Sequence, residues 1–96
     1  MTKRKLENTK EIYFKYSPGN RKNILVEKDG NPVGKKYTEK GAYDLIQTLT
    51  KNNLDIEYNF EPKAEEQIRD YAKLKGKSEK PIDRLKQSKL EIIADN

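Results

Sequence analysis

The stretch that decides the fold is Lys36–Phe60, KYTEKGAYDLIQTLTKNNLDIEYNF, which contains a helix pattern followed directly by a strand pattern. In its first part, four apolar residues recur at the spacing of one helix face. They are Ala42, Leu45, Ile46 and Leu49. The hydroxyl of Thr38 can accept hydrogen bonds from the free N–H groups of a first helical turn. This part of the stretch therefore predicts a helix over residues 38–52.

The second part of the stretch alternates between apolar and polar residues. Its apolar residues are Leu54, Ile56, Tyr58 and Phe60. Alternation of this kind is typical of a strand with one buried and one solvated face, and it predicts a strand over residues 54–60. Helix and strand together indicate a helix that lies across a sheet.

Three more strands are predicted earlier in the chain, over residues 11–17, 23–28 and 33–37. The segment Ser17-Pro18-Gly19-Asn20 has the composition of a turn. Asp29-Gly30 between two strand patterns is a strong hairpin signal. We therefore expect a meander of three strands that leads into the central helix.

Two further helices are predicted after the last strand, over residues 62–75 and 79–93. Pro62 suits a first helical turn, Gly76 is a natural helix end, and Ser78 can cap the last helix. The element order β-β-β-α-β-α-α predicts an α+β fold, in which the helices pack on one face of a small antiparallel sheet.

The length of 96 residues fits one domain, which we expect over residues 11–96 after a flexible basic arm over residues 1–10. Charged residues make up 39% and hydrophobic residues 32%, so we expect a small hydrophobic core. No apolar run approaches the ~18–20 residues of a membrane span, and the N-terminus lacks the apolar region of a signal peptide. We expect a cytoplasmic protein.

Histidine and cysteine are both absent from the chain. Their absence removes the usual general base near neutral pH, the usual zinc ligands and thiol chemistry. No glycine-rich loop matches a phosphate cradle. Asp55 and Glu57 share a strand face, but two exposed acids there more often belong to a solvated face. We therefore expect no catalytic activity, no cofactor and no metal.

Charge is distributed unevenly along the chain, whose net charge is +5. Residues 1–40 carry eleven Lys and Arg against five acids, and residues 73–89 carry seven against two. Residues 41–72, between them, carry three against seven. Two basic segments around an acidic one indicate a partner with fixed negative charge, and we expect nucleic acid, above all DNA. A Lys-rich chain can also carry such an excess for solubility alone.

The candidate nucleic-acid contacts are cations of the arm, the first turn and the outward strand face, with one aromatic ring. They are Arg4, Lys5, Tyr13, Lys15, Arg21, Lys22, Lys35 and Lys36. Aromatic rings among cations can stack on bases while the cations neutralise phosphates. The alternative is that Tyr13 packs beneath the C-terminal helices. The segment from Lys73 to Lys89 is either a second phosphate-contacting surface or the wet face of an amphipathic helix.

Three strands followed by a helix, over residues 11–52, resemble the small sheet-and-helix DNA-binding domains at integrase N-termini, in topology alone. That resemblance implies DNA binding. The strand over 54–60 and the two later helices are similar in layout to ribbon-helix-helix repressors, whose outward strand residues read the major groove. Here those residues would be Asp55, Glu57 and Asn59, and the two acids would repel the duplex. We therefore do not adopt this second resemblance.

A second class of function fits the same composition. A small protein-binding module or inhibitor, of the kind encoded by phages and mobile elements, could use an exposed strand edge or an acidic patch to occupy a partner's basic site. The acidic candidates are Asp55, Glu57, Glu61, Glu65 and Glu66. The sequence leaves both classes open, and it leaves a homodimer open as well.

Overall fold

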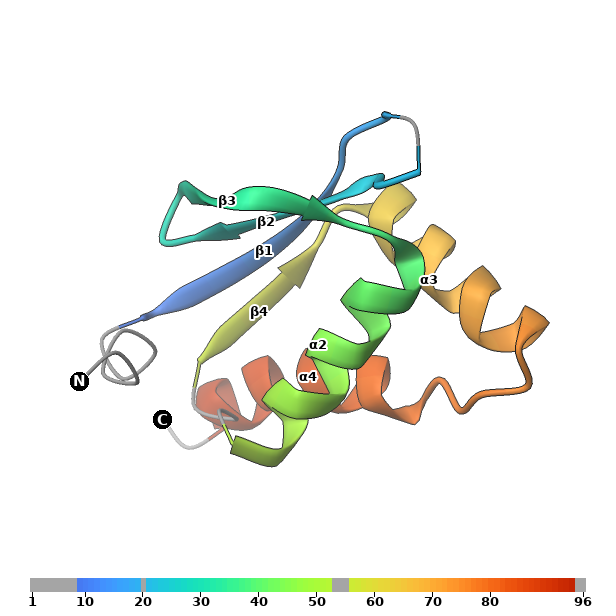
Figure 1. The fold of residues 1–96 in the computed structure, drawn as a ribbon. Helices are drawn as coiled ribbons and strands as arrows, with labels where there is room; N and C mark the ends of the chain where they lie inside the picture. The colour runs from blue at the N-terminus through green and yellow to red at the C-terminus, as the bar shows by residue number, and fades with distance from the viewer. Residues whose placement is uncertain (1–8, 20, 53–55, 95–96) are drawn as a thin grey trace.

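Seven elements follow one another in the predicted order and form the α+β fold that the sequence predicts (Figure 1). The computed structural model describes residues 9–19, 21–52 and 56–94, with the side chains of 9–19, 21–51 and 56–87. The strands are β1 (Glu11–Tyr16), β2 (Ile24–Lys28), β3 (Asn31–Tyr37) and β4 (Glu57–Phe60). The helices are α2 (Glu39–Asn52), α3 (Pro62–Leu74) and α4 (Lys80–Ala94).

The four strands form one sheet in the order β3-β2-β1-β4. β2 pairs antiparallel with both β1 and β3, whereas β4 pairs parallel with β1. The sheet is therefore mixed, and the expectation of an antiparallel sheet is correct only for the first three strands. The reason is α2: β3 ends at the same end of the sheet as β1, and α2 carries the chain back, so that β4 starts beside the start of β1 (Figure 1).

The predicted hairpin joins β2 to β3 at Asp29 and Gly30. Their φ angles of 52° and 87° both lie in the left-handed region that such a turn requires. The Asp29 carboxylate also accepts hydrogen bonds from the backbone N–H groups of Lys10 at 3.0 Å and Glu11 at 2.8 Å. The hairpin thus holds the start of β1. β3 is an edge strand, which suits Pro32 because its nitrogen has no hydrogen to donate.

The core lies between one face of the sheet and all three helices (Figure 1). Phe14 is completely buried and stacks on Phe60 with ring centroids 4.7 Å apart. The helices leave the other face of the sheet open, and Tyr13 lies on that face because it alternates with buried Ile12 and Phe14. Tyr13 is therefore not packed beneath the C-terminal helices. The other main core residues are Ile24, Val26, Ala42, Tyr43, Ile46, Leu49, Tyr58, Ile68, Ile82 and Leu85.

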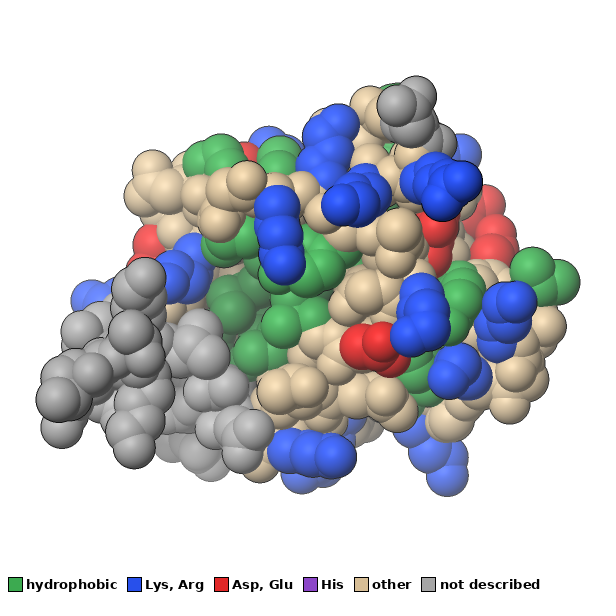
Figure 2. Space-filling model, in the orientation of Figure 1, with side chains coloured by type: hydrophobic (Ala, Val, Ile, Leu, Met, Phe, Trp, Pro, Cys, Tyr) green, Lys and Arg blue, Asp and Glu red, His purple; other side chains and the backbone are tan. Residues whose placement is uncertain are grey.

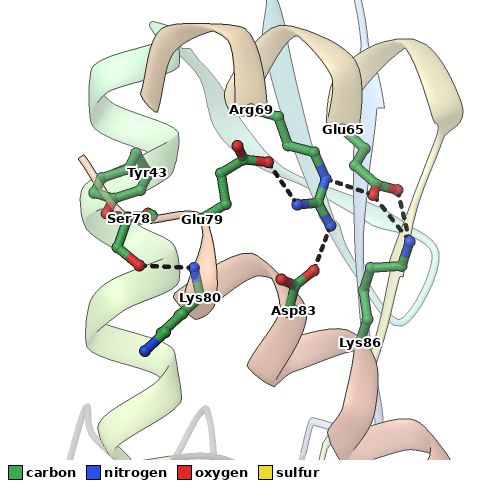
Figure 3. Close-up of polar contacts among 8 residues, drawn as sticks. All are labelled: Tyr43, Glu65, Arg69, Ser78, Glu79, Lys80, Asp83 and Lys86. Atoms are coloured by element: carbon green, nitrogen blue, oxygen red, sulfur yellow. Dashed lines mark hydrogen bonds and ion pairs between the residues drawn. The ribbon is translucent and has the colours of Figure 1, made fainter. Parts of the chain in front are cut away.

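Local signals mark the starts of α2 and α4 and the end of α3 where the sequence predicts them. The hydroxyl oxygen of Thr38 accepts from the backbone N–H of Gly41 at 3.0 Å, and that of Ser78 accepts from Lys80 N–H at 3.0 Å (Figure 3). Gly76 has a φ of 68° directly after α3, a conformation that a side chain would oppose. The Ser78 cap and the Gly76 conformation together fix the turn between α3 and α4.

An ion-pair network joins α3 to α4 (Figure 3). Arg69 donates to Glu65 and Glu79 at 2.9 Å and to Asp83 at 2.6 Å, and Lys86 donates to Glu65 at 2.9 Å. Burial opposes the charge of Arg69, but the three carboxylates outweigh it and raise the pKa of this group. Burial likewise acts to raise the pKa of Glu65, but hydrogen bonds from Lys86 and Arg69 outweigh it and lower that pKa.

Some predicted features lie outside the described residues. They include residues 1–8, most of the predicted arm, and Leu54 and Asp55 of the predicted strand. Thr9, at the end of that arm, is buried, and the carbonyl of Lys10 accepts a hydrogen bond from Glu57 N–H at 3.1 Å. In the described part of the chain, no helix combines the length and the apolar character needed to cross a membrane.

Candidate nucleic-acid interface

The loop between β1 and β2 lies at the end of the sheet opposite the β2–β3 hairpin (Figure 1). At its base, the backbone N–H of Ser17 donates to the carbonyl of Asn23 at 2.7 Å. Arg21 and Lys22 belong to this loop, and both side chains are exposed. The described part of the turn predicted over residues 17–20, Ser17 to Gly19, therefore belongs to the same loop as these two adjacent cations.

Lys36 reaches this loop from the neighbouring strand β3. Its Nζ donates to the carbonyl oxygens of Ser17 at 3.3 Å and Pro18 at 3.2 Å. Carbonyl oxygens have no net charge, so these bonds hold the ammonium group in place without neutralising it. Lys36 is half-buried, and two anchoring bonds reduce the conformational entropy that such a side chain would lose on binding a ligand.

Three cations surround a single hollow at this end of the sheet. The hollow has a volume of about 430 Å³ and is lined by Gly19, Arg21, Lys22 and Lys36, with no carboxylate among the described residues that line it. Figure 2 shows Lys and Arg side chains gathered over the upper part of the molecule, where Figure 1 places this loop and the end of β3. The arrangement is an open, positively charged concavity.

Four other cations of the described residues have acidic partners. Lys15 pairs with Glu27 at 3.4 Å, and Lys40 pairs with Asp44 at 3.1 Å. Arg69 and Lys86 belong to the network between α3 and α4. For Arg21 and Lys22, in contrast, no ion pair occurs within residues 9–19, 21–52 and 56–94. Their charge is available to an external anion.

The open face of the sheet changes sign from one end to the other. Near the loop, Lys36, Leu25 and Lys15 form one cross-strand row, because paired residues project to the same face. At the far end, Glu11 pairs with Glu57 in the register of β1 and β4. Lys36 and Lys15 therefore lie at the loop end of this face, and the paired acids Glu11 and Glu57 lie at the other end.

The structure brings together only part of the predicted contact set. Arg21, Lys22 and Lys36 line the hollow. Tyr13 and Lys15 lie together on the open face, with Lys15 Nζ 5.8 Å from the Tyr13 ring centroid. The remaining predicted residues are elsewhere: Lys35 Nζ lies 5.3 Å from the Tyr37 ring centroid, and Arg4 and Lys5 are outside the described residues.

Three features of the site were not identified from the sequence. They are the carbonyls of Ser17 and Pro18, which anchor Lys36, and the position of Gly19 against the ammonium group. The turn composition of residues 17–20 predicts a loop, but it carries no information about which distant side chain the loop contacts. Lys63, with Nζ 5.6 Å from the Tyr16 ring centroid, was also missed.

Three of the five acids considered as a protein-binding surface have hydrogen-bond partners within the protein. Glu61 accepts from Tyr16 N–H at 2.6 Å, and Glu57 accepts from the Asn59 amide at 3.2 Å. Glu65 belongs to the network with Arg69, Glu66 is exposed, and Asp55 lies outside the described residues. Where the structure describes the chain, no three acidic side chains gather in a way that could hold a metal ion.

No protein-family model matches the chain, and neither the curated proteins nor the solved structures contain a significant match to it.

Proposed function

We propose that this chain is a non-enzymatic nucleic-acid-binding protein, a small DNA-binding regulator or accessory factor that contacts the phosphate backbone with its β1–β2 loop. The observation that carries the proposal is the hollow of about 430 Å³ lined by Arg21, Lys22 and Lys36, which have no acidic partner among the residues that the structure describes. Cations that are not neutralised by the protein release counterions from nucleic acid when they contact phosphates, and this release supplies most sequence-independent affinity.

The charge distribution on the open face supports an end-on approach. A duplex lying along the whole face would place phosphates near Glu11 and Glu57, where like charges repel. Phosphates at the loop end would meet Lys36, Arg21 and Lys22 instead. The footprint on the sheet is therefore short. Arg4 and Lys5 of the N-terminal arm, which precede the opposite end of β1 in the chain, are proposed as separate contacts.

The experiment that tests this function is fluorescence anisotropy with labelled duplex DNA, single-stranded DNA and RNA. Salt is varied from about 50 to about 200 mM, the range over which phosphate binding weakens steeply. Three phosphate contacts predict a log–log salt slope of about −2 to −3, and engagement of the arm makes it steeper. Arg21→Ala together with Lys22→Ala should weaken binding to every sequence.

The matched control is Lys51→Ala. Lys51 is an exposed cation in the last turn of α2, so its removal changes the net charge as much as Arg21→Ala or Lys22→Ala made singly, but it leaves the hollow intact. Equal weakening by the control and by the loop variants would show that only net charge matters. Absence of binding at low salt would exclude the nucleic-acid function.

A second candidate function, protein binding, is favoured by one separate observation. Leu74 is 82% exposed at the end of α3, and it lines a hollow of about 270 Å³ with Glu39, Asp70 and Tyr71. An exposed leucine beside a half-buried aromatic ring and two acids suits a basic peptide with an apolar anchor. Leu74→Ser would abolish binding of such a peptide without changing the affinity for nucleic acid.

A further inference from the structure

Gly19 lies so close to Lys36 that a side chain at this position would press on the ammonium group. A Cβ atom built on Gly19 would lie 3.2 Å from Lys36 Nζ and 3.1 Å from the carbonyl oxygen of Lys22. Both distances are shorter than ordinary van der Waals contacts, and the second involves backbone. Alanine at this position would therefore displace the ammonium group or change the loop.

The hydrogen bonds of Lys36 leave one donor for a ligand. An ammonium group has three N–H donors, and Ser17 and Pro18 accept two of them. Among the described residues there is no third acceptor and no acid that pairs with this ammonium. The group is held from one side, keeps its full charge and borders the hollow.

We propose that the hollow is a discrete site for one phosphate group, held by Lys36 and by the side chains of Arg21 and Lys22. This inference rests on the proposed function and identifies the groups that would contact the phosphate. Lys36 is the fixed donor, the forked guanidinium of Arg21 can donate two parallel bonds, and Lys22 adds a mobile charge. Gly19 is a positioning residue, because its lack of a side chain leaves room for Lys36.

Phosphate fits this arrangement better than a carboxylate does. The donors come from two segments of the chain, β3 and the β1–β2 loop, and so approach the hollow from different sides. A phosphate group directs its oxygens tetrahedrally and can accept from several sides, whereas a carboxylate has two oxygens in one plane. The phosphate can belong to an internal phosphodiester or to a terminal phosphomonoester of a nucleic acid.

The test is an amide NMR titration of the full chain with inorganic phosphate, followed by oligonucleotides with and without a terminal phosphate. We expect saturable shifts at the amides of Gly19, Arg21, Lys22 and Lys36, and competition between phosphate and oligonucleotide at the same amides. Equal binding of the two oligonucleotides assigns the site to an internal phosphodiester, and preference for the phosphorylated one assigns it to a terminal group.

Two variants distinguish a defined phosphate site from non-specific attraction by the positive surface charge. Lys36→Gln keeps a donor but removes the charge, and it should weaken binding of phosphate and oligonucleotide roughly tenfold, since a charged hydrogen bond is lost. Gly19→Ala leaves the charge unchanged, and it should weaken both several-fold. Lys51→Ala should have no effect on the phosphate shifts. If Gly19→Ala does not fold, Lys36→Gln alone decides.

Two results would contradict the proposed phosphate site. One is amide shifts that grow linearly with phosphate concentration at all exposed lysines. The other is phosphate binding by Lys36→Gln that is as strong as that of the wild type. The two proposals fail differently. If oligonucleotides bind but neither variant weakens them, the phosphate site is wrong and nucleic-acid binding stands. If inorganic phosphate saturates these amides but no oligonucleotide binds, the site stands and the nucleic-acid function is wrong.

Discussion

The guanidinium of Arg69 donates a hydrogen bond to the carboxylate of Asp83 at 2.6 Å, across the interface between α3 and α4. The same guanidinium donates to Glu65 and Glu79, so one side chain serves three acids on two helices (Figure 3). Its side chain is only 21% exposed, and the solvent screens these contacts less than it screens an ordinary surface pair. Removing it would leave three carboxylates without their common partner.

Arg69→Met should therefore lower the free energy of unfolding by about 2 kcal/mol, between the values for exposed and for buried ion pairs. Urea denaturation near neutral pH measures this change. Asp83→Asn is the control, because Asp83 is 58% exposed and its loss should cost less than about 1 kcal/mol. Equal stability of wild type and Arg69→Met would show that the cost of burying the guanidinium cancels the gain from its ion pairs.

Acid should weaken the same network through Glu65. Its pKa lies below the ordinary value of 4.5 because Lys86 and Arg69 stabilise the carboxylate against the effect of burial. A lowered folded-state pKa means that this group stabilises the fold above about pH 4.5 and loses that contribution as the pH falls through the folded-state value. The stability difference between wild type and Glu65→Gln should thus be largest near neutral pH.

The measurement is urea denaturation of wild type and Glu65→Gln in a pH series that runs from neutral pH down through the titration of Glu65. The two proteins should converge in stability as the pH falls. A difference that stays constant across the series would mean that the charge of Glu65 contributes nothing and that the variant acts through packing.

Tyr43 links α2 to the turn before α4. Its hydroxyl donates to the carbonyl of Ser78 at 2.6 Å, and burial raises the pKa of this phenol. Tyr43→Phe keeps the ring in the core but leaves that carbonyl without its donor, and it should cost about 1 kcal/mol. Tyr71→Phe is the control, because no hydrogen bond of its hydroxyl occurs among the described residues. Thermal melts of both variants compare the two losses.

The Asp29 carboxylate stabilises the hairpin and the start of β1 together. Asp29→Ala would remove the acceptor for Lys10 N–H and Glu11 N–H and place alanine at a φ of 52°, so it should cost about 1 to 2 kcal/mol. Asp29→Asn keeps an acceptor and tolerates that φ, and it should lose less. Amide hydrogen exchange at Glu11 should accelerate in Asp29→Ala; unchanged protection would contradict the role of the carboxylate.

The parts of the fold that the sequence predicts correctly are those with a local cause. Thr38, Asp29-Gly30 and Gly76 each act on their own few residues, and the structure shows the expected cap, turn and helix end. In the apolar stripe of α2, Ala42, Ile46 and Leu49 are buried and Leu45 is half-buried, because their spacing matches the helix period. Such signals are independent of which segments meet in space.

The parallel pairing of β4 with β1 has no local signal. The alternation of Ile56, Tyr58 and Phe60 identifies a strand and its buried face, but a strand of either direction has the same alternation. The direction follows from the path of α2 across the sheet. Likewise, no sequence pattern reveals that Glu27 neutralises Lys15 while carbonyls anchor Lys36, since these are contacts between strands.

This difference between Lys15 and Lys36 leads to a prediction about binding. Both lie in the cross-strand row that also contains Leu25. Within the described part of the chain, Lys15 has an acidic partner, Glu27 at 3.4 Å, and Lys36 has none. A cation that is already neutralised displaces fewer counterions from nucleic acid than a free one. Lys15→Ala should therefore leave the log–log salt slope of binding nearly unchanged, while Arg21→Ala should reduce its magnitude by about 0.7 to 0.9.

Anisotropy over the same salt series measures both slopes. Lys15→Ala also frees the carboxylate of Glu27, so its affinity should fall slightly even though the slope does not change. A slope that decreases equally in the two variants would mean that the ion pair opens on binding and that the phosphate contacts extend along the open face. The same slope in Arg21→Ala and wild type would instead show that the loop does not contact phosphate, because the loss of a phosphate contact reduces the number of counterions released on binding.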